Sequence, residues 1–186
     1  MSKFLVIAEK PSVAQSYAKN LSAYKREDGY LEGESCIVSW CLGHLAEYAQ
    51  PEEYDPKYEK WQFDDLPILP EAWKLKVSKD KKKQFDVLKG LMNRSDVEYL
   101  VNGCDAGREG ELIFQRVYDL AGCRKPVKRL WISSMEDAAI QKGFQTMKSE
   151  EEYKNLCMAA VCRAQADWLI GMNGTRAYTT RYFKRL

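Results

Sequence analysis

The sequence is poor in the side chains that build zinc sites and hydrolytic centres. His44 is its only histidine, and none of its six cysteines forms a C-x-x-C pair. The common cysteine and histidine zinc sites are therefore excluded. A serine or cysteine hydrolase would need His44 as its base, and nothing around the cysteines indicates a nucleophile. We expect reduced and mostly buried thiols at Cys36, Cys41, Cys104, Cys123, Cys157 and Cys162.

Long apolar runs and a strong net charge are also missing. No uninterrupted apolar stretch reaches the roughly 18 residues that a membrane span needs, and residues 1–7 are too short for the apolar part of a signal peptide. We therefore expect a cytoplasmic protein with no membrane partner. The net charge is only +2, but positive charge gathers in residues 79–83 and in the acid-free residues 174–186. Either run is typical of a solvated face as well as of a polyanion partner.

Strand patterns alternate with helix patterns over most of the chain. Short apolar runs predict strands, and apolar residues at helical spacing predict helices. Residues 29–41 also carry the pattern of a hairpin with a turn at Gly33. Such alternation predicts an α/β fold with a mainly parallel sheet and helices on both faces. The expected strands are 4–8, 97–102 and 127–132, and the expected helices are 13–21, 82–92, 110–121 and 137–147.

The pattern changes near residue 150. Residues 153–172 are alanine-rich with long helical spacing, so we expect one domain over 1–150 and the start of a second, helical one over 151–186. Residues 51–73 contain four prolines and several aromatic side chains. We expect an ordered, irregular segment whose aromatic rings pack on the first domain.

Acidic residues follow two of the expected strands. Glu9 comes directly after the first, and Asp105 and Glu109 follow the strand that ends near Asn102. If the strands are neighbours, three carboxylates meet at one edge of the sheet, where ligands bind in open α/β folds. Carboxylates are the hard oxygen ligands that Mg²⁺ prefers. Ordinary acids in a solvated turn and at a helix N-terminus would give the same spacing.

Several segments resemble one family. AEKPS at 8–12 and DAGREGE at 105–111 resemble the two signature segments of the Toprim domain. The whole arrangement resembles bacterial type IA DNA topoisomerases of the topoisomerase III group. Further matching stretches are GHL at 43–45, LPILP at 66–70, RLWISS at 129–134 and RAQADWLIGMNGTRA at 163–177. The resemblance implies a Rossmann-like Toprim sheet followed by part of a domain that forms a groove for single-stranded DNA.

The resemblance also implies roles for the acidic edge. Glu9 would be the catalytic acid that assists proton transfer and would contribute to the metal site, in which Asp105 and Glu109 bind Mg²⁺. Lys10 would lie beside the DNA phosphate that is cleaved, where an ammonium neutralises developing charge. Arg108 would position the phosphate or the tyrosine, or would instead pair with Glu111 or another acid.

One position departs from the family pattern. Gly107 replaces the second aspartate of the family's Asp-x-Asp-x-Glu set. The loss of one oxygen ligand predicts weaker intrinsic Mg²⁺ affinity and puts a second bound ion in doubt. A similar variation is found among topoisomerase III enzymes, so the substitution does not imply an inactive site.

DNA contacts are implied for the C-terminal stretch. Arg163 would bind DNA phosphates, or would form a salt bridge within the helix to Asp167, four residues later. Asp167, Asn173, Thr175 and Arg176 would lie in the same DNA-binding region, together with Lys10. Such contacts are salt-sensitive and largely tolerant of sequence. Trp168 is more typical of a core residue than of a base-stacking one.

The family's nucleophile is not visible. Type IA enzymes cleave one strand through a tyrosine that keeps a 5′-phosphotyrosyl link, and none of the eleven tyrosines lies in a segment resembling that motif. We therefore expect the first part of a longer, monomeric, nucleoid-associated bacterial enzyme whose other domains are its partners, and no strand cleavage by this part alone. Two alternatives stay open: a Toprim nuclease or primase, and a non-catalytic module that binds DNA or a partner protein.

Overall fold

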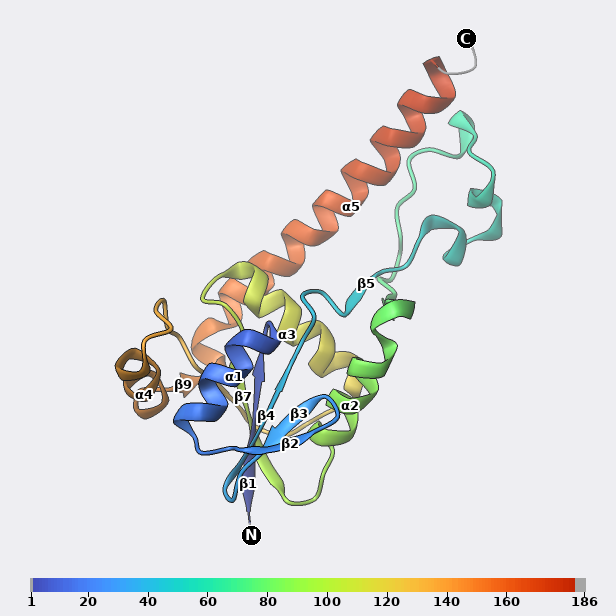
Figure 1. Ribbon diagram of the computed structural model, residues 1–186. Helices are drawn as coiled ribbons and strands as arrows, with labels where there is room; N and C mark the ends of the chain where they lie inside the picture. The colour runs from blue at the N-terminus through green and yellow to red at the C-terminus, as the bar shows by residue number, and fades with distance from the viewer. Residues whose placement is uncertain (1, 183–186) are drawn as a thin grey trace. The chain divides into compact units, whose positions relative to one another are not determined.

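The computed structural model describes residues 2–182 (Figure 1). The helices are α1 (Pro11–Asn20), α2 (Lys82–Met92), α3 (Arg108–Ala121), α4 (Asp137–Gln145) and α5 (Lys154–Tyr182). The strands are β1 (Lys3–Ala8), β2 (Lys25–Glu27), β3 (Tyr30–Glu32), β4 (Cys36–Trp40), β5 (Ala46–Tyr48), β6 (Leu75–Val77), β7 (Val97–Gly103), β8 (Val127–Arg129) and β9 (Lys148–Ser149). Five single 3₁₀ turns lie at Pro51–Glu53, Pro56–Glu59, Phe63–Asp65, Lys79–Lys81 and Glu150–Tyr153.

A seven-stranded sheet with the order β2-β3-β4-β1-β7-β8-β9 forms the centre of the fold. The four middle strands, β4, β1, β7 and β8, are parallel to one another. The strands outside them pair antiparallel. The prediction of a mainly parallel α/β sheet is confirmed.

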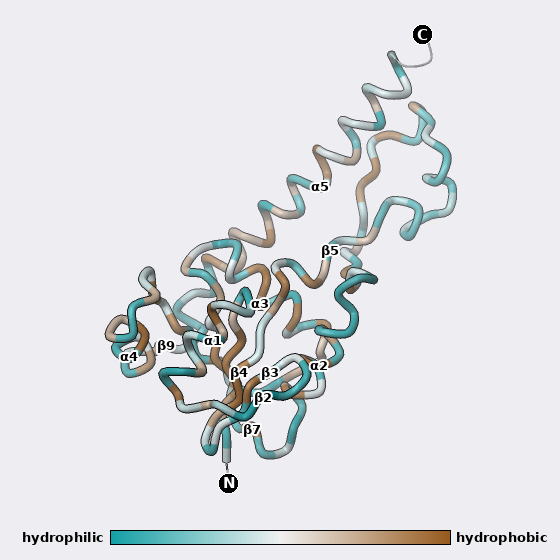
Figure 2. Tube along the Cα trace, in the orientation of Figure 1, coloured by the Kyte–Doolittle hydropathy of each residue, from teal (hydrophilic) through white to brown (hydrophobic). Residues whose placement is uncertain are grey.

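Alternation along β1 divides the core between the two faces of the sheet. Leu5 and Ile7 belong to a cluster that includes residues of α2 and α3. Val6 and Ala8 belong to another cluster, which includes residues of α1 and α4. Figure 2 shows the hydrophobic colour concentrated on the central strands. Helices therefore cover both faces, and the carboxyl ends of the parallel strands are left for loops that carry polar residues.

Most predicted elements lie within a few residues of the observed ones. The helix expected at 82–92 is α2 itself, whereas β8 ends at Arg129, earlier than expected. Strands β2, β5, β6 and β9 were not predicted, because each has only two or three residues, too few for a clear apolar alternation. Helix α5 runs ten residues beyond the expected end at Met172. Residues 183–186, the last part of the positively charged stretch 174–186, lie outside the described residues.

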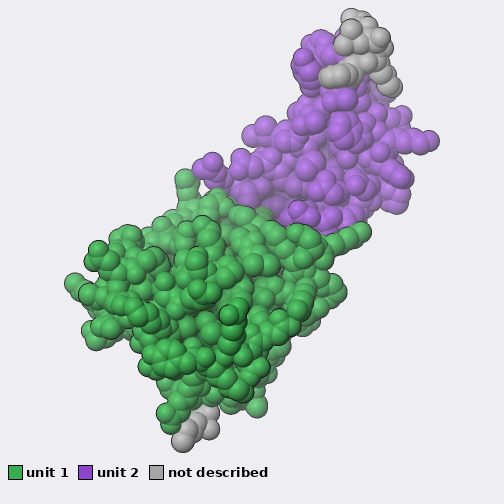
Figure 3. Space-filling model, viewed as in Figure 1, with its two compact units in different colours: residues 1–46, 77–160 green, residues 47–76, 161–186 purple. Residues whose placement is uncertain are grey.

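The chain divides into two compact units (Figure 3). Unit 1 comprises residues 1–46 and 77–160, and unit 2 comprises residues 47–76 and 161–186. The aromatic residues of 51–73 were expected to pack on the sheet domain. The structure corrects this: Tyr54 and Trp73 pack with Tyr48 around Trp168 of α5 in a separate cluster. In residues 2–182, no helix is both long and apolar enough to cross a membrane.

Candidate active site

The carboxyl ends of β1 and β7 bring two predicted acids together. Ala8 is in register with Gly103 on the neighbouring strand, so the residues that follow each strand leave the sheet at the same edge. The backbone N–H of Asp105 donates to Oε2 of Glu9 at 3.4 Å. Glu9 is half-buried and Asp105 is exposed. The first two acids of the predicted site therefore lie side by side and open to solvent.

The third acid lies in the first turn of α3. Glu109 is exposed, and its Oε2 lies 3.1 Å from Nε2 of His44. Over residues 2–182, no three His, Cys, Asp or Glu side chains form a group arranged to hold a metal ion. Carboxylate oxygens are the type of ligand that Mg²⁺ prefers. Glu109, however, contacts His44 and does not join Glu9 and Asp105 in a metal-binding group.

Two cations at this edge are free. Lys10 follows Glu9, and Arg108 is the first residue of α3. Neither side chain has a hydrogen-bond or ion-pair partner within the described part of the chain. Arg108 does not pair with Glu111, because that carboxylate is bound to Arg129. The alternative of an Arg108–Glu111 pair is therefore wrong, and both cations are available to an anion.

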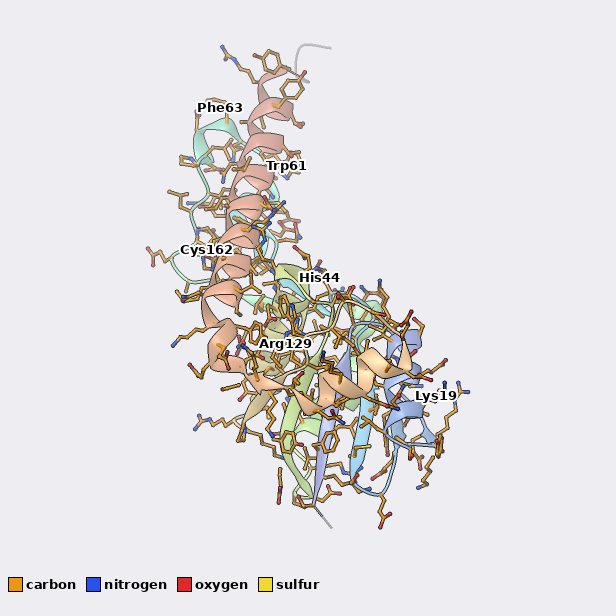
Figure 4. All side chains as sticks on the ribbon, turned by 90° about the vertical axis from the view of Figure 1, so that its left-hand side faces the viewer. Lys19, His44, Trp61, Phe63, Arg129 and Cys162 are labelled. Carbon is orange, nitrogen blue, oxygen red and sulfur yellow. The ribbon has the colours of Figure 1, made fainter. Side chains whose placement is uncertain are left out.

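Arg129 fixes the loop that carries Asp105. Its side chain is fully buried in the interior of unit 1 (Figure 4). Its guanidinium donates to the backbone carbonyls of Asn102, Cys104 and Leu130 at 2.7–3.1 Å, and to that of Asp105 at 2.8 Å. Nε donates to Oε1 of Glu111 at 2.6 Å. All three guanidinium nitrogens are engaged, so the path of the chain after β7 is held by one side chain.

A close backbone approach fixes the same loop from the α3 side. A Cβ built on Gly110 would lie 2.0 Å from the carbonyl oxygen of Asp105, so only glycine fits there. The same construction on Gly107 meets nothing within 4 Å. Gly107 has an extended backbone that any residue adopts. The position where the family carries a second aspartate therefore has room for one.

A second carboxylate lies behind the Arg129 pair. Nδ2 of Asn102 donates to Oε2 of Glu111 at 3.3 Å and to Oε1 of Glu150 at 3.2 Å. Burial, followed by the neighbouring charge of Glu111, raises the pKa of Glu150 from the ordinary 4.5 to about 7. Glu150 therefore keeps its proton up to about neutral pH, beside a Glu111 carboxylate whose charge is paired with Arg129.

The residues predicted to bind DNA are divided between the two units, with Lys10 in unit 1 and the other five in unit 2. In unit 2, Arg163 forms an exposed 3.6 Å pair with Asp167, and Thr175 is exposed. Asn173 bonds both the N–H and the carbonyl of Ile68. Arg176 is buried, donates to the carbonyl of Tyr58 at 2.6 Å and lies over the Trp61 ring. Asn173 and Arg176 therefore hold residues 58–68 against α5.

Comparison with known families assigns the chain to one of them. The family model of the Toprim domain matches residues 4–135, from β1 to the loop after β8. The chain belongs to the Toprim domain family. Both ends of the acidic edge, Glu9 and the loop 105–109, lie within the matched part.

The chain is also similar to part of two longer proteins. The chain is 50% identical over 186 residues to DNA topoisomerase 3 of Bacillus subtilis and 52% identical to DNA topoisomerase 3 of Bacillus cereus. All of the chain is covered but only 26% of each relative, so the chain spans about a quarter of their length. The solved structure of topoisomerase I from Thermotoga maritima matches 81% of the chain and 22% of that protein, with a TM-score of 0.52 at 18% identity. That likeness supports the fold.

The sequence did not reveal the buried residues that support the loop at the acidic edge of the sheet. Arg129 lay in a matching stretch but was not singled out, and Asn102 and Glu150 were not considered as site residues. One signal was available: Arg129 is a cation directly before the apolar Leu130, and a charge in a buried strand needs a buried acid. Its partner Glu111, on another element, is not evident from spacing.

Proposed function

We propose that the chain is the Toprim part of a type IA DNA topoisomerase of the topoisomerase III group. The longer bacterial enzyme would change DNA topology by transient cleavage of one strand, with the nucleophilic tyrosine in a later domain. The observation that carries this proposal is the 50% identity to DNA topoisomerase 3 over all 186 residues. The paired Glu9 and Asp105 and the two free cations at the sheet edge support it from the geometry.

We assign the roles by the chemistry of each side chain. Glu9 is half-buried, next to the backbone of Asp105, and moves the proton of the attacking or leaving hydroxyl. Lys10 and Arg108 are free cations that bind the phosphate, and Lys10 neutralises its developing charge. Arg129 and Gly110 hold the loop so that the backbone of Asp105 stays beside the Glu9 carboxylate.

Asp105 and Glu109 are the proposed Mg²⁺ ligands, with Glu9 next to them. Bound Mg²⁺ would supply charge stabilisation for the phosphate oxygens. The described side chains do not form a complete set, because Glu109 contacts His44. Binding of the ion by Glu109 would require this contact with His44 to open. A DNA phosphate would supply further oxygen ligands to the ion.

The DNA that this fragment is proposed to contact is single-stranded. Of the residues expected to bind it, we retain Lys10, Arg163 and Thr175, whose side chains are exposed, and Asp167 as the partner of Arg163. Asn173 and Arg176 are left out, because contacts within unit 2 use their polar groups. The proposed enzyme is cytoplasmic, acts at the nucleoid and functions as a monomer.

An assay with negatively supercoiled plasmid tests the proposal. The longer protein that contains this chain should relax the plasmid in Mg²⁺ and, after denaturation, remain joined to a DNA 5′ end. The 186-residue chain alone should leave the plasmid supercoiled. Nicking by the chain alone that is lost in Asp105→Asn would instead establish a Toprim nuclease, and no cleavage by the longer protein would favour a binding module.

A further inference from the structure

A hollow of about 570 Å³ lies in unit 1, away from the acidic edge. Its wall comes from α3, from the residues that lead into β8 and from residues 149–158, and it contains none of the proposed catalytic or metal-binding residues. The volume lies within the roughly 300–1,000 Å³ typical of small-molecule sites. Glu150 forms part of the wall, so the carboxyl group that bonds Asn102 faces this hollow.

The carboxyl group of Glu150 has no cation of its own. The neighbouring Glu111 is paired with Arg129, whereas Glu150 forms no salt bridge within residues 2–182. Oε1 of Glu150 accepts from Asn102, and Oε2 is buried without a hydrogen-bond partner in the same part of the chain. When Glu150 is ionised, the wall therefore holds a largely buried negative charge without a partner, and such a charge favours a cation.

The two lysines of the wall do not supply this cation. Lys125 donates its ammonium group to the backbone carbonyl of Arg94. Lys154 is exposed and forms no ion pair with any residue that the structure describes. An anionic ligand would lie beside two carboxyl groups, because Glu151 lines the hollow together with Glu150. The hollow therefore suits a positively charged occupant better than a negatively charged one.

The rest of the wall is largely aromatic and aliphatic. The rings of Phe114 and Tyr118 are stacked with their centroids 6.0 Å apart, and Val127 and Met158 also line the hollow. Aromatic faces attract cations, and a thioether contacts an apolar ring well. A hydrated inorganic ion would make no use of these groups, and no three His, Cys, Asp or Glu side chains of the described chain form a metal-binding group. The wall therefore favours an organic cation.

We propose that this hollow binds a small organic monocation, an ammonium group joined to an aromatic ring by a short alkyl chain, and that the ammonium pairs with Glu150. The ammonium donates to Oε2 of Glu150, and the ring lies against Tyr118 and Met158. The inference goes beyond the proposed function and does not depend on it. Because the hollow lies away from the acidic edge, its occupant is not the proposed DNA substrate.

Binding should release one proton. Free Glu150 keeps its proton up to about neutral pH, because burial and then Glu111 raise its pKa to about 7. The ammonium takes the place of that proton, which passes to the solvent, so the affinity should rise about tenfold from about pH 6 to about pH 8. The groups that face Glu150 are Glu111, paired with Arg129, and Cys157, whose thiol stays neutral because burial first raises its pKa to about 11.

Isothermal titration calorimetry of the 186-residue chain tests the site with three probes of similar shape. Phenethylammonium is positive, phenethyl alcohol is neutral and phenylacetate is negative. At about pH 8, phenethylammonium should bind about tenfold more tightly than phenethyl alcohol, the size expected for one hydrogen bond to a charged group, and phenylacetate should not bind. At about pH 6, the measured enthalpy should depend on the ionisation enthalpy of the buffer, because the released proton is taken up by the buffer.

Glu150→Gln keeps the shape of the side chain and removes its charge. It should weaken phenethylammonium binding about tenfold at about pH 8 and abolish the dependence of the affinity on pH. Glu151→Gln removes an exposed carboxylate from the same wall, and this control should change the affinity less than about twofold. The comparison of the three probes on the native chain needs no variant.

Three results would overturn the proposed site. Equal affinity for phenethylammonium and phenethyl alcohol would show that the wall recognises no charge. Native affinity and native pH dependence in Glu150→Gln would place the cation elsewhere. No binding of phenethylammonium at millimolar concentration would exclude this class of ligand. None of these results bears on plasmid relaxation by the longer protein, so the proposed function is tested separately.

Discussion

Nε of Arg129 lies 2.6 Å from Oε1 of Glu111, and both side chains are fully buried. The pair joins β8 to α3 directly beneath the loop of Asp105. The pair adds little net stability, because the cost of desolvating two charges offsets much of their attraction. Its main effect is to fix the position of the loop. Removing one partner of the pair is strongly destabilising, since it leaves the other charge buried and unpaired.

Arg129→Met tests that asymmetry. The substitution keeps a long side chain but leaves Glu111 unpaired and removes the hydrogen bonds to the loop carbonyls. The free energy of unfolding should fall by about 3–5 kcal/mol, measured by urea denaturation. Arg163→Met, which breaks an exposed pair, is the matched control and should change stability little. Equal effects of the two substitutions would show that the buried pair has no special role.

Gly110→Ala tests the close approach to the Asp105 carbonyl. The added Cβ would lie 2.0 Å from that oxygen, so the loop or α3 must move. We expect a loss of at least about 1–3 kcal/mol, as for other overpacked sites. Gly107→Ala is the control, with nothing within 4 Å. Thermal unfolding of both variants measures the difference, and an unchanged midpoint for Gly110→Ala would contradict the close approach.

Glu150 should make stability depend on pH. Its pKa is raised to about 7 by burial and by Glu111, while Asn102 and Arg129 oppose the shift. The folded chain therefore binds more protons than the unfolded chain between about pH 4.5 and 7, and stability falls as pH rises through that window. The full effect is at most about 3 kcal/mol, and solvent access to the carboxyl reduces it.

Glu150→Gln should remove this part of the pH dependence, because the amide cannot ionise. Glu151→Gln, at an exposed neighbouring carboxyl, is the control and should leave the profile unchanged. Urea unfolding at several pH values between 4.5 and 8 measures both. Cys157, which also faces Glu150, does not titrate in this window, since its pKa is raised to about 11 by burial and then by Glu111. A Glu150→Gln profile as steep as that of the native chain would assign the dependence to another group.

Gly107→Asp should strengthen Mg²⁺ binding. The position is open and extended, so the new carboxylate has room, and it would add an oxygen ligand if it faces the ion. Isothermal titration calorimetry with MgCl₂ measures the affinity. Gly90→Asp adds the same charge at another open position, in α2, and should leave the affinity unchanged. Unchanged or weaker binding by Gly107→Asp would mean that position 107 does not face the ion.

The sequence was sufficient for the elements whose apolar pattern is strong. Apolar runs in β1 and β7 and helical spacing in α2 and α3 predicted the sheet and both of its faces, and the strand ends predicted the meeting of Glu9 with Asp105. Contacts between distant segments were not predictable in this way. The Glu109–His44 contact, the Arg129–Glu111 pair and the bonds of Asn173 to Ile68 each join residues whose separation carries no periodic signal.

The most direct test of the proposed function is plasmid relaxation by the longer protein with single acids of this edge removed. Glu9→Gln and Asp105→Asn each remove one negative charge at the edge. Glu98→Gln, at an exposed position on β7, removes one elsewhere. The account predicts that both edge variants lose most relaxation in Mg²⁺ while Glu98→Gln keeps it. Native relaxation by Glu9→Gln and Asp105→Asn would contradict it and would leave this Toprim chain as a binding module.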